Sequence, residues 1–186
     1  MSIEIPKTLN ETFNGLINLT YEAKKLFNVC HGLTWKTEGK NLTFIKKIDY
    51  SPLSIGYVYV ANKKNKSQII YIGETGKAFG RFEMVKSTVI NFKNRERITN
   101  KRIKFAILEL LSNNFTVKVY FFIPSNLGKA YDFDITIPSK QIETKLFELY
   151  KEKYNNEPLI NSFRRTKEND YKTEWMNTVD GFIKNF

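Results

Sequence analysis

The stretch that most constrains the fold runs from Gly56 to Arg81. It contains two short segments rich in β-branched and aromatic residues, 57–60 and 68–72, joined by a polar run. Such a pattern predicts a β-hairpin. A tyrosine stands at the corresponding end of each strand, and a lone arginine follows the second strand. We interpret the rest of the chain as scaffold or partner for this hairpin.

Size and composition limit the remaining possibilities. The chain has 186 residues, of which 41% are hydrophobic and 15% aromatic, so one domain with an appendage and a filled core is expected. No apolar run approaches the roughly 20 residues that span a bilayer, and residues 1–10 carry no signal-peptide pattern. The single cysteine, Cys30, excludes an internal disulfide, so we expect a cytoplasmic protein.

The net charge is +11, and it is concentrated in one segment. Residues 81–104 hold eight basic and two acidic side chains, which is more than half of the surplus. A concentrated positive charge favours a polyanionic partner, with nucleic acid first and an anionic membrane surface second. The predicted phosphate contacts are Lys93, Arg95, Arg97, Lys101, Arg102, Arg164 and Arg165.

Periodicity assigns the remaining elements. Segment 115–123 alternates and then becomes continuously apolar, which predicts a central strand buried on both faces. A capping box at Thr8 opens a predicted helix that runs to about Cys30, with Gly32 as its stop. Further helices are expected from about Phe79 to Ile90, from about 99 to 111, near 142–150 and in the polar tail, and a strand at 42–45.

Several of these residues together resemble the GIY-YIG nuclease superfamily. The resemblance rests on Tyr57-Val58-Tyr59, then Tyr71-Ile72-Gly73, then Arg81 ten positions after Tyr71, then a glutamate on a helix, then Pro158-Leu159-Ile160-Asn161. It covers about 56–161. The last part of this region is a strand, then a proline, a loop and a helix with a glutamate. This order also resembles the short type II restriction endonucleases of that superfamily.

The resemblance implies an α/β (α+β) fold with a small, mostly antiparallel three-stranded sheet flanked by helices. It also suggests a division of the chain. Residues 1–54 would form an N-terminal helical and strand extension that contacts DNA. Residues 55–163 would form the nuclease core, with a basic insertion at about 86–104, and 164–186 a tail packed on the core.

The resemblance also implies roles for single residues. Tyr59 would take a proton from water, and Tyr71 would order the water or the phosphate. Arg81 would bind the scissile phosphate, since a guanidinium fork suits that group, and Lys77 would assist electrostatically. Glu143 would hold one Mg²⁺ or Mn²⁺, because Mg²⁺ takes one or two protein carboxylates and keeps its waters. Asn161 would complete the set.

Several assignments stay open at this point. Tyr57 stands where the family has glycine, so either Tyr57 or Tyr59 is the tyrosine of the first motif. Glu148 competes with Glu143 as the metal ligand. Val85 stands where many members of the family have a tyrosine or histidine. Arg81 itself has an alternative as a surface ion pair, and Asn161 as a structural brace.

The predicted function is metal-dependent cleavage of double-stranded DNA, and the resemblance implies 5′-phosphate and 3′-hydroxyl products. A type II restriction enzyme would work as a homodimer beside a cognate methyltransferase. One alternative is a nicking, mobile-element, phage or repair nuclease on the same core. Another is a catalytically silent DNA-binding module.

Overall fold

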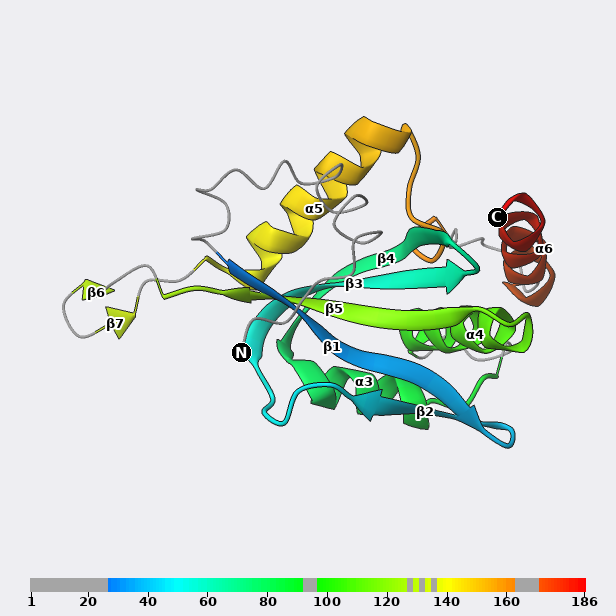
Figure 1. Cartoon of the computed structure of the whole chain (residues 1–186), viewed down its shortest axis with the longest axis horizontal. Helices are drawn as coiled ribbons and strands as arrows, with labels where there is room; N and C mark the ends of the chain where they lie inside the picture. The colour runs from blue at the N-terminus through cyan, green and yellow to red at the C-terminus, as the bar shows by residue number, and fades with distance from the viewer. Residues whose placement is uncertain (1–26, 92–96, 127–128, 131–132, 135–136, 163–170) are drawn as a thin grey trace.

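The computed structural model describes residues 27–91, 97–126, 129–130, 133–134, 137–162 and 171–186. Strands and helices follow one another along these residues as shown in Figure 1. In chain order they are β1 (Phe27–Glu38), β2 (Asn41–Lys46), β3 (Leu53–Lys63), β4 (Lys66–Lys77), α3 (Ala78–Ser87), α4 (Ile98–Ser112), β5 (Thr116–Pro124), β6 (Lys129–Ala130), β7 (Phe133–Asp134), α5 (Ser139–Tyr154) and α6 (Tyr171–Asn185).

The main sheet has five strands in the order β2-β1-β5-β3-β4, and every neighbouring pair is antiparallel. The fold is therefore of the mixed α+β type, as expected. The predicted number of three strands is wrong. Strands β3, β4 and β5 form the expected set, and β1 and β2 from the N-terminal segment continue the same sheet beyond β5 (Figure 1).

The N-terminal segment departs from the prediction at its described end. The helix expected to reach Cys30 is replaced from Phe27 onward by β1, and Gly32 lies inside that strand at a bulge instead of ending a helix. Cys30 is buried in the strand. Pairing with β5 overrides the apparent helical spacing here, because a strand beside the central strand satisfies its backbone groups through the ladder. The rest of the predicted helix lies outside the described residues.

The hairpin is confirmed and is longer than predicted. Its strands β3 and β4 run from Leu53 to Lys77, and only two residues separate them. The turn is tight because Lys64 adopts a left-handed conformation, with φ of 54°, as two-residue hairpin loops require. The polar run expected as a loop therefore belongs mostly to the strands.

The predicted helices 99–111 and 142–150 and the tail helix are confirmed as α4, α5 and α6. The helix expected from Phe79 is confirmed as α3, but it ends at Ser87. Val89 lies beyond it with 78% of its surface exposed. Thr88 takes an extended backbone conformation, which ends the helix there. No described helix has the length and apolarity needed to cross a membrane.

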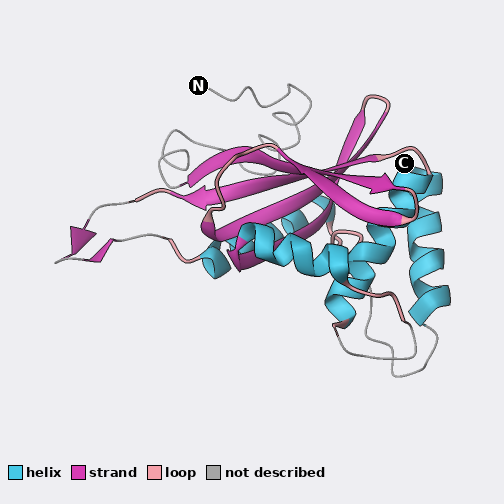
Figure 2. Cartoon of the chain, turned by 90° about the horizontal axis from the view of Figure 1, so that it is seen from below, coloured by secondary structure: helices cyan, strands magenta, loops and turns pink. Residues whose placement is uncertain are grey.

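Alternation along the strands divides the core between two faces of the twisted sheet (Figure 2). On one face Tyr57, Tyr59 and Ala61 of β3 pack with residues of α3 and α4. On the other, Val58 and Val60 pack against α5. Side chains two apart in a strand share a face, so β3 places its tyrosines under α3. Helix α6 closes the end of the molecule against α4 (Figure 1).

Candidate active site

Three tyrosines meet on the α3 face of the hairpin. Tyr59 pairs across the ladder with Tyr71, and Tyr57 is two residues before Tyr59 on the same face. Their ring centroids are 5.4 Å apart for Tyr59 and Tyr71, 5.7 Å for Tyr57 and Tyr59, and 6.0 Å for Tyr57 and Tyr71. The spacing fits edge-to-face and tilted aromatic pairs. The two tyrosine-bearing motifs are therefore brought together as the sequence predicts.

Gly73 makes room for one of these rings. It lies directly across the ladder from Tyr57. A Cβ atom at Gly73 would lie 2.8 Å from the Tyr57 hydroxyl, which is closer than real Cβ contacts allow. The glycine of the Tyr-Ile-Gly motif therefore lets the Tyr57 phenol cross over the neighbouring strand.

Arg81 extends from α3 toward this group. Its side chain is half-buried and lies beside Tyr57, where its positive charge opposes the rise in the pKa of that phenol. A guanidinium nitrogen also donates a hydrogen bond to Oδ1 of Asn100, which lies on α4. Among the described residues no carboxylate forms an ion pair with Arg81, and Glu83 pairs with Lys86 instead. No described carboxylate therefore offsets the positive charge of the guanidinium beside the phenols.

Burial shifts the ionisation of two of the phenols. Burial raises the pKa of Tyr57, although the nearby Arg81 acts in the opposite direction. Burial likewise raises the pKa of Tyr59 well above its usual value. Neither phenol ionises at neutral pH in the free protein. A role as a base would therefore need the pKa of the phenol to be lowered in the substrate complex.

The contacts distinguish Tyr57 from Tyr59, which the sequence left open. The Tyr59 hydroxyl is buried and makes no hydrogen bond with the described residues. Its ring lies among those of Trp35 and Phe82, with centroid distances of 6.4 Å and 6.2 Å. Tyr57, in contrast, is in side-chain contact with Arg81, whereas the side chain beside the Tyr59 hydroxyl is that of Trp35. This geometry favours Tyr57 as the first-motif tyrosine, and the assignment of Tyr59 stays a prediction.

Two further predicted positions lie on or beside α3. Lys77 is exposed at the N-terminal end of the helix, one turn before Arg81. Val85, one turn after Arg81, is fully buried in the core. Lys77 therefore faces solvent at the start of α3, Arg81 lies beside the phenols, and Val85 packs in the core.

Glu143 lies on α5, in its second turn. Helix α5 approaches β3 closely, because a Cβ atom at Gly56 would lie 2.6 Å from the Ile142 side chain. The Glu143 side chain is 21% exposed and pairs with Lys140. Glu148 makes the same kind of pair with Lys145, but 59% of its side chain is exposed. Of the two glutamates, Glu143 is the one turned toward the sheet.

A second carboxylate lies near Glu143. Glu74 follows the Tyr-Ile-Gly motif, and its Oε2 accepts a hydrogen bond of 3.1 Å from the hydroxyl of Ser139, the first residue of α5. Glu143 first, and Glu74 after it, raise the pKa of the Lys140 ammonium, and Tyr71 lies near the same ammonium. These groups therefore gather where β4 ends and α5 begins.

The donor set at this corner fits a Mg²⁺ or Mn²⁺ ion of the open kind. Such an ion keeps several waters and takes one or two carboxylates, and Glu143 provides one that is partly exposed. Within the described residues no group of three acidic, histidine or cysteine side chains is gathered as a full protein cage would need. Glu143 is the residue that would hold the ion.

Asn161 is committed to the backbone of the edge strand. Its Oδ1 accepts a hydrogen bond of 2.9 Å from the Ile72 amide, and its Nδ2 donates one of 3.1 Å to the Ile72 carbonyl. The backbone N–H of Ile160 also donates a hydrogen bond of 2.8 Å to the carbonyl of Ile70. These contacts cover the exposed edge of β4 and fit the bracing alternative.

The predicted phosphate contacts are placed unequally. Arg97 is exposed just before α4. Lys101 is only 5% exposed, and its ammonium donates to the Asn91 carbonyl at 3.0 Å, so it is directed inward. Arg102 is half-buried. The remaining predicted contacts lie outside the described residues: Lys93, Arg95, Arg164 and Arg165.

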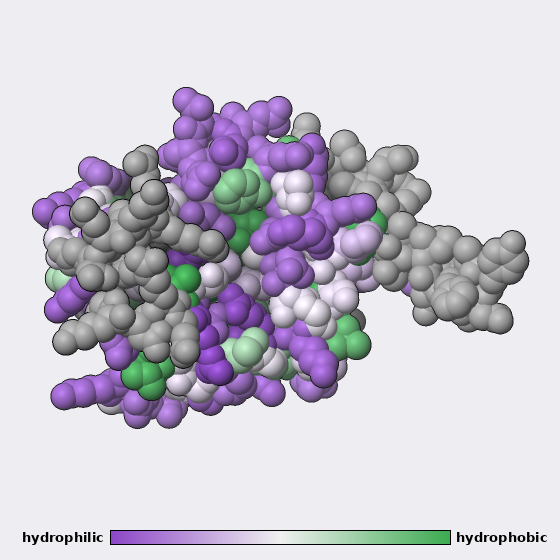
Figure 3. Space-filling view, turned by 180° about the vertical axis from the view of Figure 1, so that it is seen from behind, coloured by the Kyte–Doolittle hydropathy of each residue, from purple (hydrophilic) through white to green (hydrophobic). Residues whose placement is uncertain are grey.

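The surface behind the sheet is mainly polar. Figure 3 shows hydrophilic residues over most of the described part of this side, with hydrophobic residues visible in small separate patches. A small apolar patch is normal for a protein surface, whereas protein-binding sites are larger. The described part of this side therefore shows no large apolar patch.

The sequence did not reveal two polar residues of the site. In the sequence, Asn100 is an ordinary residue in the first turn of a predicted helix, and nothing in the local pattern connects it with Arg81. Glu74 stands next to the Tyr-Ile-Gly motif, and this position was the only available signal. Both contacts join segments far apart in the chain, 19 residues for Asn100 and 65 for Glu74.

Comparisons with known proteins give distant similarities of shape alone. No family model matches the chain, and no curated protein matches it. A point mutant of bacteriophage T4 EndoII aligns with a TM-score of 0.46 at 12% identity, over 76% of this chain and 98% of that one. The restriction endonuclease HPY188I in complex with product DNA aligns with a TM-score of 0.37 at 21% identity, over 77% and 84% of the two chains.

Proposed function

We propose that this protein is a metal-dependent endonuclease of the GIY-YIG type that hydrolyses double-stranded DNA. The observation that supports it best is the position of Arg81. Its guanidinium lies beside the phenols and, among the described residues, has no carboxylate partner. A guanidinium in this state can bind a phosphate through two parallel hydrogen bonds.

The residues divide the chemical work. Phosphodiester hydrolysis needs an activated water and neutralisation of the charge on the phosphoryl oxygens. Arg81 would hold the phosphate, with Lys77 adding positive charge at the near end of α3. Tyr57 or Tyr59 and Tyr71 would order the attacking water through their hydroxyls. Asn161 would hold β4, and hence Tyr71, in place.

Glu143 would bind one Mg²⁺ or Mn²⁺ ion. When bound, such an ion lowers the pKa of water and neutralises phosphate charge. The Glu143 carboxylate contributes a partly exposed ligand on a helix fixed against β3. Lys140 would give up its ion pair with Glu143 when the ion enters.

We further propose a sequence-specific type II restriction enzyme that acts as a homodimer and has a cognate methyltransferase. A dimer would place two sites on the two strands of a palindrome. The exposed Arg97 and the predicted contacts in the basic insertion and tail would bind phosphates and fix position without reading sequence.

Digestion of a sequenced double-stranded DNA with Mg²⁺ or Mn²⁺, followed by mapping of the ends, tests the function. Cleavage of both strands at fixed positions is the expected result. Nicked circles alone from a plasmid would support the nicking alternative over the restriction enzyme. DNA left intact but bound would support the silent binding module.

Glu143→Gln should abolish cleavage and leave DNA binding intact. The matched control is Glu148→Gln on the same helix, because Glu148 makes the same kind of ion pair three residues from a lysine but is exposed. Full activity of Glu143→Gln would refute the metal assignment, and lost activity of Glu148→Gln would transfer it.

A further inference from the structure

The buried amide of Asn100 contacts Arg81, the side chain on which the proposed function mainly rests. Asn100 is 5% exposed, one of few buried polar side chains among the described residues, and its Oδ1 accepts a hydrogen bond from Arg81. It lies in the first turn of α4, whereas Arg81 lies on α3. The bond therefore joins two helices at the guanidinium itself.

We propose that Asn100 is a positioning residue that orients the Arg81 guanidinium toward the phenols and the phosphate. This inference rests on the proposed function for its consequence in catalysis. A guanidinium has five N–H donors, so one bond to Asn100 restricts the rotation of the fork and leaves the other donors for Tyr57 and a phosphate.

The chemistry of the acceptor matters as much as its position. An amide oxygen accepts a hydrogen bond without bringing a negative charge, so Arg81 keeps its charge for an anion. A carboxylate at this position would hold the guanidinium equally well and neutralise it. Asparagine therefore combines fixed orientation with free charge, a combination that aspartate cannot supply.

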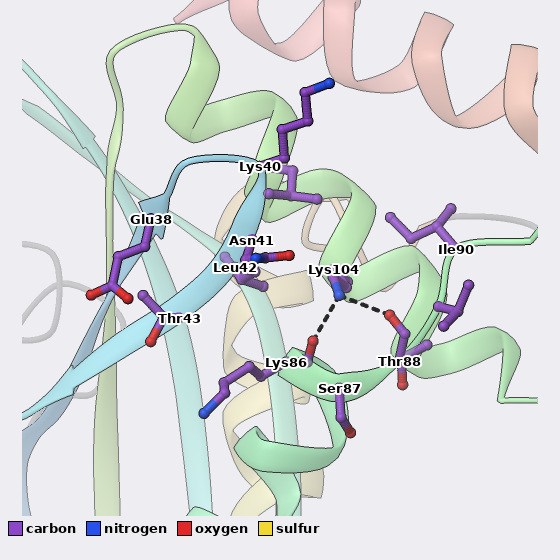
Figure 4. Close-up of a pocket in the computed structure, with 12 residues that line it drawn as sticks. Glu38, Lys40, Asn41, Leu42, Thr43, Lys86, Ser87, Thr88, Ile90 and Lys104 are labelled. Carbon is purple, nitrogen blue, oxygen red and sulfur yellow. Dashed lines mark hydrogen bonds between the residues drawn. The ribbon is translucent and has the colours of Figure 1, made fainter.

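Neighbouring residues of α4 hold the rest of α3 in the same way. Figure 4 shows the Lys104 ammonium between the carbonyl oxygens of Lys86 and Thr88, at 2.7 Å and 2.8 Å. These carbonyls lie at the C-terminal end of α3, where helix carbonyls lack partners. Lys101 donates to the carbonyl of Asn91, in the segment that follows α3. The first half of α4 thus fixes both the helix that carries Arg81 and the side chain of Arg81.

Nitrogen NMR of the arginine side chains tests the contact without any assay of activity. In the wild-type chain labelled with ¹⁵N-arginine, the Arg81 guanidinium should give separate, slowly exchanging Nη signals, assigned by their loss in Arg81→Lys. Asn100→Ser should average them, and Asn100→Asp should keep them. Unchanged Arg81 signals in Asn100→Ser would overturn the proposal.

Cleavage kinetics test the consequence. Misplacement of a catalytic group by about 1 Å can cost roughly a hundredfold in rate, and we expect a loss of about that size in single-turnover cleavage by Asn100→Ser, with little change in DNA affinity. Asn100→Asp should also cleave slowly although its Arg81 signals stay fixed, because its charge competes with the phosphate. Wild-type rates in both variants would overturn the positioning role.

Asn113→Ser is the matched control. Asn113 is half-buried at the end of the same helix, and its amide donates to the Glu109 carbonyl. It should lose stability and keep both the Arg81 signals and the cleavage rate, and an equal loss of rate in this variant would overturn a specific role for Asn100. If the wild-type chain cleaves no DNA, the proposed nuclease function fails, while the NMR result still decides whether Asn100 holds Arg81.

Discussion

The two first-motif tyrosines differ in what their hydroxyls touch. Tyr57 has Arg81 beside it, whereas the Tyr59 hydroxyl is buried without a hydrogen bond to the described residues. A buried hydroxyl without a partner costs about 1–3 kcal/mol. Tyr59→Phe should therefore leave the chain as stable or up to about 1 kcal/mol more stable. Urea unfolding measures the change.

Activity should separate the same two residues in the opposite sense. Tyr57→Phe removes the hydroxyl that interacts with Arg81 and should lower single-turnover cleavage by about a hundredfold or more, as general-base or positioning groups do. Tyr59→Phe should cleave at close to the wild-type rate. The reverse order of the two rates would show that Tyr59 is the first-motif tyrosine.

Alkaline pH should reveal the buried phenol of Tyr59. Its pKa in the folded protein lies well above the usual value of about 10. Between these values the unfolded chain loses a proton that the folded chain keeps. Stability is therefore complete below about pH 10 and falls as the pH rises, by about 1.4 kcal/mol per pH unit for each such phenol.

Tyr59→Phe isolates that contribution. Tyr57 and Tyr120 also have a raised pKa because they are buried, and they contribute equally in both proteins. The free energy of unfolding, measured in urea from about pH 9 to about pH 11 so as to bracket the ordinary phenol pKa, should fall less steeply in the variant. Parallel curves would mean that Tyr59 ionises in the folded state as readily as in the unfolded one.

At the scale of elements, α5 depends on one close approach to β3. A Cβ atom at Gly56 would lie 2.6 Å from Ile142 and 3.8 Å from the Glu143 amide. Gly56→Ala should therefore push α5 outward, at a cost of about 1–3 kcal/mol in stability, and should lower cleavage because Glu143 moves with the helix. Thermal unfolding and cleavage rates measure the two effects.

Gly76→Ala provides the control for that substitution. Apart from its two chain neighbours, no atom of the described residues lies within 4 Å of a Cβ built at Gly76, on the same hairpin. This variant should keep stability and activity. An equal loss in the two variants would place the effect in the hairpin itself and not in the position of α5.

Elements with strong local patterns could be predicted from the sequence, and long-range partners could not. The hairpin, β5 and the helices carrying Arg81 and Glu143 follow from alternation and helical spacing. Strand β1 was missed at its described end because its pairing with β5, residues distant in sequence, decides its conformation. The site followed the same rule, since the resemblance indicated Arg81 but no local pattern could indicate Asn100.

At the scale of the whole molecule, the net charge of +11 does not translate directly into phosphate contacts. Lys104 and Lys101 direct their ammonium groups to backbone carbonyls inside the fold. Arg97 is exposed at the start of α4. Some basic residues of this segment therefore hold the helices together, and others face solvent.

Salt dependence of DNA binding measures this division. Each phosphate contact contributes about −0.9 to the slope of log K against log salt. Arg97→Gln should make that slope shallower by about one at every DNA sequence, because a phosphate contact carries no sequence information. Lys101→Met keeps the buried stem and removes the inward ammonium, so it should lower stability and leave the slope unchanged. The opposite result, a shallower slope in Lys101→Met and a wild-type slope in Arg97→Gln, would mean that the Lys101 side chain turns outward when DNA binds.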